Sequence, residues 1–97
     1  MSNVRRLVFT PQFVRASKRF VGRDGRRQQC IRDTLRKMEA DIFDPRLKTH
    51  RLIGDLAGYF SSSCDYDCRI VFRLECDAKT RHECIVLTNV GTHDEVY

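Results

Sequence analysis

Tryptophan is absent from the 97-residue chain, and proline and glycine are scarce, with two and five residues. Collagen-like chains need glycine at every third position, and disordered chains are rich in proline and polar repeats, so both classes are excluded. No stretch approaches the roughly 18 apolar residues of a membrane span, and the N-terminus lacks the apolar core of a secretory signal. We therefore expect a folded protein of the cytoplasm that makes no membrane contact.

Motifs for several common chemistries are missing as well. The chain has no glycine-rich phosphate loop, no paired carboxylates at catalytic spacing and no Ser/His/Asp order, which excludes the reactions that depend on them. Five cysteines are an odd number, and without a secretory signal they predict reduced thiols. The side chains of Cys64, Cys68, Cys76, His82 and Cys84 are enough ligands for one zinc ion, but their spacing differs from that of paired zinc knuckles. We expect buried thiols here, with no metal or cofactor, and a zinc site is the alternative.

The length fits one domain, residues 1–97, because a second domain would have too little chain to bury its own core. Eighteen Lys and Arg residues against 13 Asp and Glu residues give a net charge of +5, and the excess lies mostly between Arg15 and Lys37. This balance predicts nucleic acid or an acidic protein as the partner. The alternative is a pair of solvated helix faces.

Two helices are predicted in the first half of the chain. After a strand over residues 4–9, Thr10-Pro11 is typical of a helix start, and apolar residues recur at helical spacing until Gly22. A second helical pattern runs to Phe43, where Asp44-Pro45 ends it, because the residue before a proline is pushed out of the α conformation. The two segments predict a basic helical hairpin.

The second half of the chain is predicted to be rich in strands. Residues 52–60 lead into a polar stretch over 61–67, in which 65–67 predict a tight turn. Residues 69–75 alternate between apolar and charged side chains, residues 84–90 are β-prone, and 91–97 form a short polar tail. The order strand, helix, helix, strand, strand, strand predicts an α+β domain. Its antiparallel-rich sheet should carry the helical hairpin on one face and leave the other face open.

The open face is where chemistry is expected. Arg69 and Arg73 should lie on it, since residues two apart on a strand point the same way. His50 and His93 lie in polar segments, and an imidazole can accept a proton and return it, as phosphodiester cleavage requires at two oxygens. An arginine would stabilise the phosphate charge. A single histidine in a polar segment is more often an ordinary surface residue, so this prediction requires the two histidines to meet in space.

The second half also resembles the RelE superfamily of bacterial type II toxins, most closely the YafQ-like branch of mRNA interferases. The stretches that carry the resemblance are 44–52, 54–59, 67–72 and 91–97. The resemblance implies a RelE-like microbial RNase fold, β-α-α-β-β-β. It implies the toxin of a type II toxin-antitoxin system, a ribosome-dependent endoribonuclease that needs no metal. Attack by the RNA 2′-hydroxyl would leave a 2′,3′-cyclic phosphate.

The resemblance also assigns residues to roles. The catalytic residues that it implies are His50, Asp67, Arg69, His93 and Tyr97. The residues that we expect to contact RNA are Arg51, Ser63, Arg73 and Asn89. Three positions depart from the YafQ-like pattern: Ser63 stands in place of a histidine, Cys68 in place of a tryptophan and Asn89 in place of an arginine. A serine hydroxyl cannot replace an imidazole near neutral pH, so either His50 and His93 share the proton transfers or activity is lower.

The partners implied by the resemblance are a cognate antitoxin protein, the ribosome with its mRNA, and operator DNA only through the antitoxin complex. An acidic antitoxin segment is expected over the basic helices and the open sheet face, because the charges are complementary. Two alternatives remain: a ParE-like inhibitor that binds DNA gyrase without cutting RNA, and a catalytically weak relative that only binds its antitoxin.

Overall fold

The computed structural model describes residues 5–97 of the chain. In chain order the elements are β1 Arg6–Phe9, α1 Pro11–Val21, α2 Gly25–Ala40, the 3-10 turn η1 Pro45–Leu47, β2 His50–Arg51, the 3-10 turn η2 Gly54–Leu56, β3 Phe60–Asp65, β4 Cys68–Cys76, β5 Glu83–Gly91 and α3 His93–Val96. The α+β class, the helical hairpin and the two long C-terminal strands are confirmed. The two-residue strand β2 and the helix α3 are additions to the predicted order.

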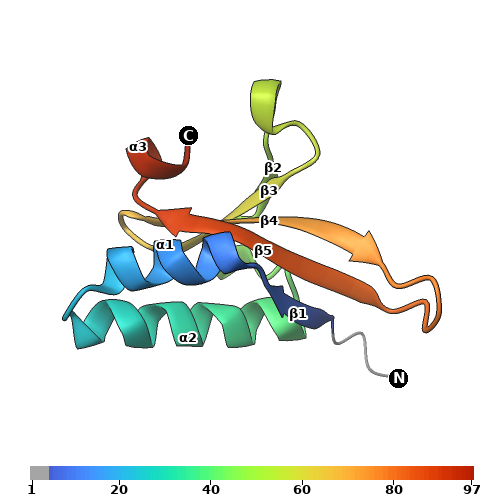
Figure 1. The fold of residues 1–97 in the computed structure, drawn as a ribbon, viewed down its shortest axis with the longest axis horizontal. Helices are drawn as coiled ribbons and strands as arrows, with labels where there is room; N and C mark the ends of the chain where they lie inside the picture. The colour runs from blue at the N-terminus through green and yellow to red at the C-terminus, as the bar shows by residue number, and fades with distance from the viewer. Residues whose placement is uncertain (1–4) are drawn as a thin grey trace.

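The strands form one five-stranded sheet in the order β1-β5-β4-β3-β2. Strand β1 runs parallel to β5, and the other neighbours are antiparallel, so the sheet is antiparallel-rich as expected. Helices α1 and α2 lie side by side on one face of the sheet, whereas α3 and the η2 segment rise from the opposite face (Figure 1). The face without the hairpin is therefore bordered by two short raised segments.

Local signals explain both long helices. The Thr10 hydroxyl accepts a hydrogen bond from the Phe13 N–H (3.2 Å) at the start of α1, and Gly22, at φ 54°, ends it. The Asp24 carboxylate caps α2 in the same way. Helix α2 ends at Ala40, earlier than the predicted Phe43, because the chain turns extended immediately after it.

The hydrophobic core lies between the hairpin and the sheet. Met38 of α2 and Phe72 of β4 are fully buried in it. Leu47, the last residue of η1, is also buried there and closes the core below β3. Within the described residues 5–97, no helix is long and apolar enough to cross a membrane.

The predicted strand over 52–60 is wrong, whereas the tight turn expected at 65–67 is confirmed, because residues 66 and 67 form the turn between β3 and β4. Most of 52–60 is the η2 loop, in which Gly54 and Gly58 have positive φ values of 70° and 96° that a regular strand does not allow. The strand begins at Phe60 and uses the polar residues that follow, so Ser61 and Ser62 are fully buried. The first predicted strand is confirmed over Arg6–Phe9, and residue 4 lies outside the described residues.

The prediction of reduced thiols is wrong for one pair of cysteines. Cys64 and Cys68 form a disulfide across the β3–β4 turn, where their Cα atoms are 5.2 Å apart. Their spacing is ordinary for a disulfide, and a shift of register between Ser63 and Asp65 brings the two strand ends together. Cys30, Cys76 and Cys84 are free. The number of cysteines could not reveal this pairing, because it depends on the hairpin geometry.

Candidate active site

Strand register places three polar residues and one valine in a row across the sheet face that points away from the hairpin. His50 of β2 pairs with Ser61 of β3, Ser61 with Val71 of β4, and Val71 with Asn89 of β5. Directly paired residues point to the same side of a sheet. Val71 alternates with Ile70 and Phe72, which belong to the core beneath the helices, so the row faces away from the hairpin.

His50 is exposed at the end of this row, and its ring is oriented by the backbone. The His50 Nδ1 atom lies 3.1 Å from the Lys48 carbonyl oxygen. A carbonyl only accepts, so Nδ1 carries the hydrogen in this contact and Nε2 holds the lone pair of the neutral ring. The neighbouring Arg51 points to the other side of the strand, and its guanidinium lies over the Phe60 ring at 5.6 Å.

Helix α3 brings the other predicted residues of the chain terminus back over the sheet. Tyr97 donates a short hydrogen bond from its hydroxyl to the Ser61 hydroxyl, directly beside His50 in the row. The His93 ring meets the Tyr97 ring edge-on, with centroids 4.7 Å apart. His93 Nδ1 also lies 3.4 Å from an Asp94 carboxylate oxygen, which can only accept its hydrogen.

Asp67 contacts the same helix from the β3–β4 turn. One of its carboxylate oxygens accepts a hydrogen bond from the His93 backbone N–H at 3.4 Å. A capping box holds the start of α3 as well: the Thr92 hydroxyl accepts from the Glu95 N–H, and the Glu95 carboxylate accepts from the Thr92 N–H at 2.8 Å. This hydrogen bond from the backbone lowers the pKa of Glu95. Three side chains therefore fix the segment that carries His93 and Tyr97.

His50 and Tyr97 line one hollow of about 520 Å³, which we call the histidine hollow. The other residues that line it are Leu52, Ile53, Asp55, Leu56 and Val96. The lining residues come from the η2 loop on one side and from α3 on the other, the two segments that rise from the same face of the sheet in Figure 1. His93 is not part of the lining and lies against the outer side of the hollow through the Tyr97 ring.

Arg69 lies in a different place from the histidines. Its Nη1 atom donates to the carbonyl oxygens of Asp65, Tyr66 and Cys68, at 3.0 to 3.4 Å, and so holds the β3–β4 turn. Arg69 lines a second hollow of about 360 Å³ together with Ser63. We call this second space the basic hollow.

The remaining predicted RNA contacts are dispersed. Arg73 lies further along β4, and its hydrogen bond to Glu75, at 3.1 Å, raises the pKa of the guanidinium. Asn89 is in the row with His50, and its side chain accepts from the Val90 N–H. Sequence reasoning missed Ser61, the partner of Tyr97, because a serine in a polar stretch carries no signal until the strand register is known.

A metal cluster is not present among residues 5–97, where no three His, Cys, Asp or Glu side chains are grouped to hold an ion. The disulfide uses Cys64 and Cys68, two of the ligands in the zinc alternative.

Comparison with solved structures identifies the fold. The YoeB/ParE toxin from Agrobacterium tumefaciens superposes with a TM-score of 0.73 at 24% identity, over 91% of this chain and 98% of that one. YafQ from E. coli gives 0.73 at 16% identity, over 96% and 98%. YoeB in a heterotetrameric YoeB-YefM toxin-antitoxin complex from Staphylococcus aureus gives 0.67 at 21% identity, over 92% and 97%. The chain has the YoeB/YafQ toxin fold.

The RelE-like fold implied by the sequence resemblance is thereby confirmed. No protein-family model and no curated protein sequence matches the chain. Within the YoeB/YafQ fold, the end of the chain returns over the open sheet face and places Tyr97 beside His50. Two of the predicted catalytic residues thus share a hollow, two more hold or touch its α3 wall, and Arg69 lies in the basic hollow.

Proposed function

We propose that the chain is the toxin of a type II toxin-antitoxin system and acts in the cytoplasm as a ribosome-dependent mRNA endoribonuclease. The observation that supports this proposal best is that His50 and Tyr97 share one hollow, while the His93 ring packs edge-on against Tyr97. The residues come from β2 and α3, at opposite ends of the strand-rich half, so their meeting is not a consequence of sequence proximity. Solved toxins of the same fold are further support.

The proposed reaction is an in-line displacement at phosphorus. The RNA 2′-oxygen attacks the adjacent phosphorus, the bond to the 5′-oxygen breaks, and a 2′,3′-cyclic phosphate remains. One group must remove the 2′-hydroxyl proton and another must protonate the leaving 5′-oxygen. His50 and His93 divide these two transfers. His50 is suited to the first, because the Lys48 carbonyl keeps the hydrogen on Nδ1 and leaves Nε2 able to accept.

The other proposed site residues position the reaction. Asp67 acts through the His93 backbone, and Tyr97 offers an aromatic face on which an unstacked base can lie. Arg69 keeps the β3–β4 turn in place with Nη1, and within residues 5–97 its Nε and Nη2 atoms make no hydrogen bond to protein. Those two nitrogens can meet phosphate oxygens. We propose weaker, peripheral RNA contacts for Arg51, Arg73, Ser63 and Asn89.

The basic helices fit an acidic partner. Residues 15–37 contain half of the chain's Lys and Arg residues and few acidic ones, and α1 and α2 form the face opposite the histidine hollow. We propose a cognate antitoxin with an acidic segment as that partner, and contact with operator DNA only through the complex. YoeB, a protein of the same fold, forms a heterotetrameric toxin-antitoxin complex with YefM, which supports an antitoxin as the partner.

The test is translation-dependent mRNA cleavage in a cell extract. The wild-type chain should cut mRNA only while ribosomes translate it, and His50→Ala and His93→Ala should each lower the rate by about 100-fold or more, the usual effect of losing a general acid or base. His82→Ala is the matched control, because His82 is exposed in the β4–β5 connection. Undiminished cleavage by both site variants, or equal losses in all three, would refute the assignment.

A ParE-like inhibitor remains the second candidate, since one similar structure carries the name YoeB/ParE. Such a protein would block DNA supercoiling by purified gyrase without cutting RNA. The same three variants would then inhibit gyrase equally, because contact alone requires no proton transfer. A chain that neither cuts mRNA nor inhibits gyrase would be the catalytically weak relative.

A further inference from the structure

The basic hollow gathers cations from separate elements. Lys37 lies in α2, Arg46 in η1, Lys48 at the end of η1 and Arg69 in β4. Asp65 is the one acidic residue among those that line it. The hollow lies along the edge of β3 that the two-residue strand β2 leaves uncovered. Four positive charges against one negative charge make it attractive to an anion.

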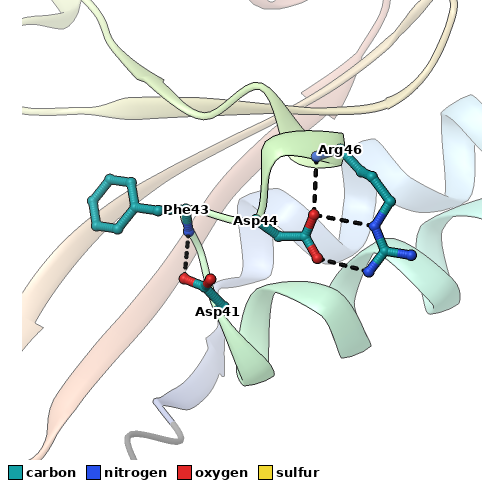
Figure 2. A network of polar contacts seen from close by, with 4 residues as sticks. All are labelled: Asp41, Phe43, Asp44 and Arg46. Carbon is teal, nitrogen blue, oxygen red and sulfur yellow. Dashed lines mark hydrogen bonds and ion pairs between the residues drawn. The ribbon is translucent and has the colours of Figure 1, made fainter.

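Two of the four cations are already engaged. Arg46 pairs with Asp44, whose carboxylate accepts from both the Arg46 backbone and its guanidinium, with the shortest contact at 2.7 Å (Figure 2). Arg69 holds the β3–β4 turn through Nη1. Within residues 5–97, Lys37 and Lys48 have no ion pair. The charge available to a ligand therefore comes from these two lysines and from Arg69, which donates to carbonyl oxygens but has no ion pair among residues 5–97.

Lys48 connects the basic hollow to the histidine hollow. Lys48 is one of the residues that line the first, and its carbonyl oxygen contacts the His50 ring, which lines the second. Lys48 also adopts a left-handed conformation, φ 51° and ψ 39°, which is uncommon for a residue with a long side chain. The lining of the basic hollow therefore comes within hydrogen-bond distance of the His50 ring at Lys48.

We propose that the basic hollow binds a backbone phosphate of the same RNA strand, on a nucleotide beside the one that is cut. This inference rests on the proposed function and adds a second point of attachment to it. Phosphate contacts set the position of a strand without reading its sequence. Holding one phosphate by Lys37 and Lys48 would keep the scissile bond aligned with His50.

RNA suits the hollow better than an acidic peptide does. Most of the lining residues are polar or charged, Tyr66 is the exposed aromatic among them, and Leu47 is buried. A peptide helix needs an apolar groove in addition to charge. A phosphodiester needs only cations and hydrogen-bond donors, and both are present.

The test compares two double variants of equal charge. Lys37→Gln/Lys48→Asn removes both lysine charges, and asparagine tolerates the left-handed conformation at 48. The matched control is Lys79→Gln/Arg81→Asn in the β4–β5 connection, where Arg81 has φ 59° and is also left-handed. Figure 1 shows this connection at the far end of the long hairpin from α3. The same thermal midpoint for the two variants shows that both fold.

The readout is the affinity for a short single-stranded RNA with 2′-O-methyl groups, which blocks cleavage, measured by fluorescence anisotropy over a range of salt. Each lost phosphate contact reduces the slope of log affinity against log salt by about 0.7, so the site variant, which loses one phosphate, should lose about 0.7 of slope and bind about tenfold more weakly. The control variant should keep nearly the wild-type salt slope and the wild-type affinity for RNA. Equal behaviour of the two variants overturns the proposal, and so does weaker binding with an unchanged slope.

Two further measurements separate this inference from the proposed function. Inorganic phosphate, titrated into the wild-type protein, should shift the amide signals of Lys37, Lys48 and Ser63, and unchanged signals would count against the hollow. The affinity for an oligoglutamate peptide should change less between the wild type and the site variant than the affinity for RNA does. An equal loss for the peptide would show an unselective charge effect and overturn the choice of RNA. If the hollow binds RNA but the wild-type chain leaves translated mRNA intact, only the nuclease function fails.

Discussion

The hydroxyl of Thr92 should control whether His93 and Tyr97 stay in place. Helix α3 spans only four residues, and a helix this short is not stable by itself. It is held by the capping box of Thr92 and Glu95, by burial of Val96 and by the hydrogen bond from Tyr97 to Ser61. Thr92→Ala removes the hydroxyl that accepts from the Glu95 N–H at 3.3 Å.

The expected cost is local. Replacing an N-cap threonine by alanine costs about 1 kcal/mol, which raises the population of an opened α3 about fivefold. The core between the hairpin and the sheet does not depend on this cap, so α3 should open without global unfolding. Thr92→Ser keeps the hydroxyl and is the matched control.

Amide hydrogen exchange measures this opening directly. The N–H groups of Val96 and Tyr97 donate to the carbonyls of Thr92 and His93, so both should exchange about fivefold faster in Thr92→Ala. Thr92→Ser should exchange like the wild type, and core amides should be unaffected in both variants. If the nuclease proposal holds, mRNA cleavage falls in Thr92→Ala alone. Unchanged exchange at Val96 and Tyr97, or equal acceleration throughout the core, would refute a separately opening α3.

Three further predictions concern other parts of the fold. Hydrogen bonds from Arg46 lower the pKa of Asp44 to about 2, so the stabilisation that they give is present above the ordinary value of 3.8 and is lost as pH falls through about 2. An NMR titration of the Asp44 side chain should show this midpoint, and Arg46→Gln should raise it. An unchanged midpoint in the variant would contradict the pairing. The Cys64–Cys68 disulfide closes a loop with a sequence separation of four. Its reduction should therefore lower the free energy of unfolding, measured in urea, by about 2 kcal/mol at most. A larger loss would mean that the bond does more than close this turn. Met38→Ala should cost about 2–5 kcal/mol in the same assay, because Met38 is fully buried, and a cost under 1 kcal/mol would show that the core refills the space.

Local signals sufficed for the elements with a strong period or a cap. Thr10 and Gly22 mark the two ends of α1, and the alternation of β4 separates core residues such as Phe72 from those of the open face. Ser61 had no such signal. A serine is buried in a strand only when a partner satisfies its hydroxyl, and here the partner is Tyr97, from the other end of the sheet region.

The disulfide shows the same limit. The number of cysteines indicates whether all of them can pair in a disulfide framework. A single disulfide across a tight turn depends instead on the backbone distance between its two residues. Register between β3 and β4, with its shift after Ser63, sets that distance for Cys64 and Cys68. The turn geometry also explains why the Arg69 side chain lies away from the histidine hollow. Its guanidinium donates hydrogen bonds to the backbone carbonyl oxygens of the turn.

The sequence by itself determined which chemical groups are available: two imidazoles in polar segments, a terminal tyrosine, an excess of cations and the helical hairpin beneath the sheet. The tertiary structure decided which of these groups meet. The register of β2 and β3 sets His50 beside Ser61, and the capped α3 returns Tyr97 to the same point. Strand register and chain reversal depend on contacts between distant residues, and for that reason no local pattern contains them.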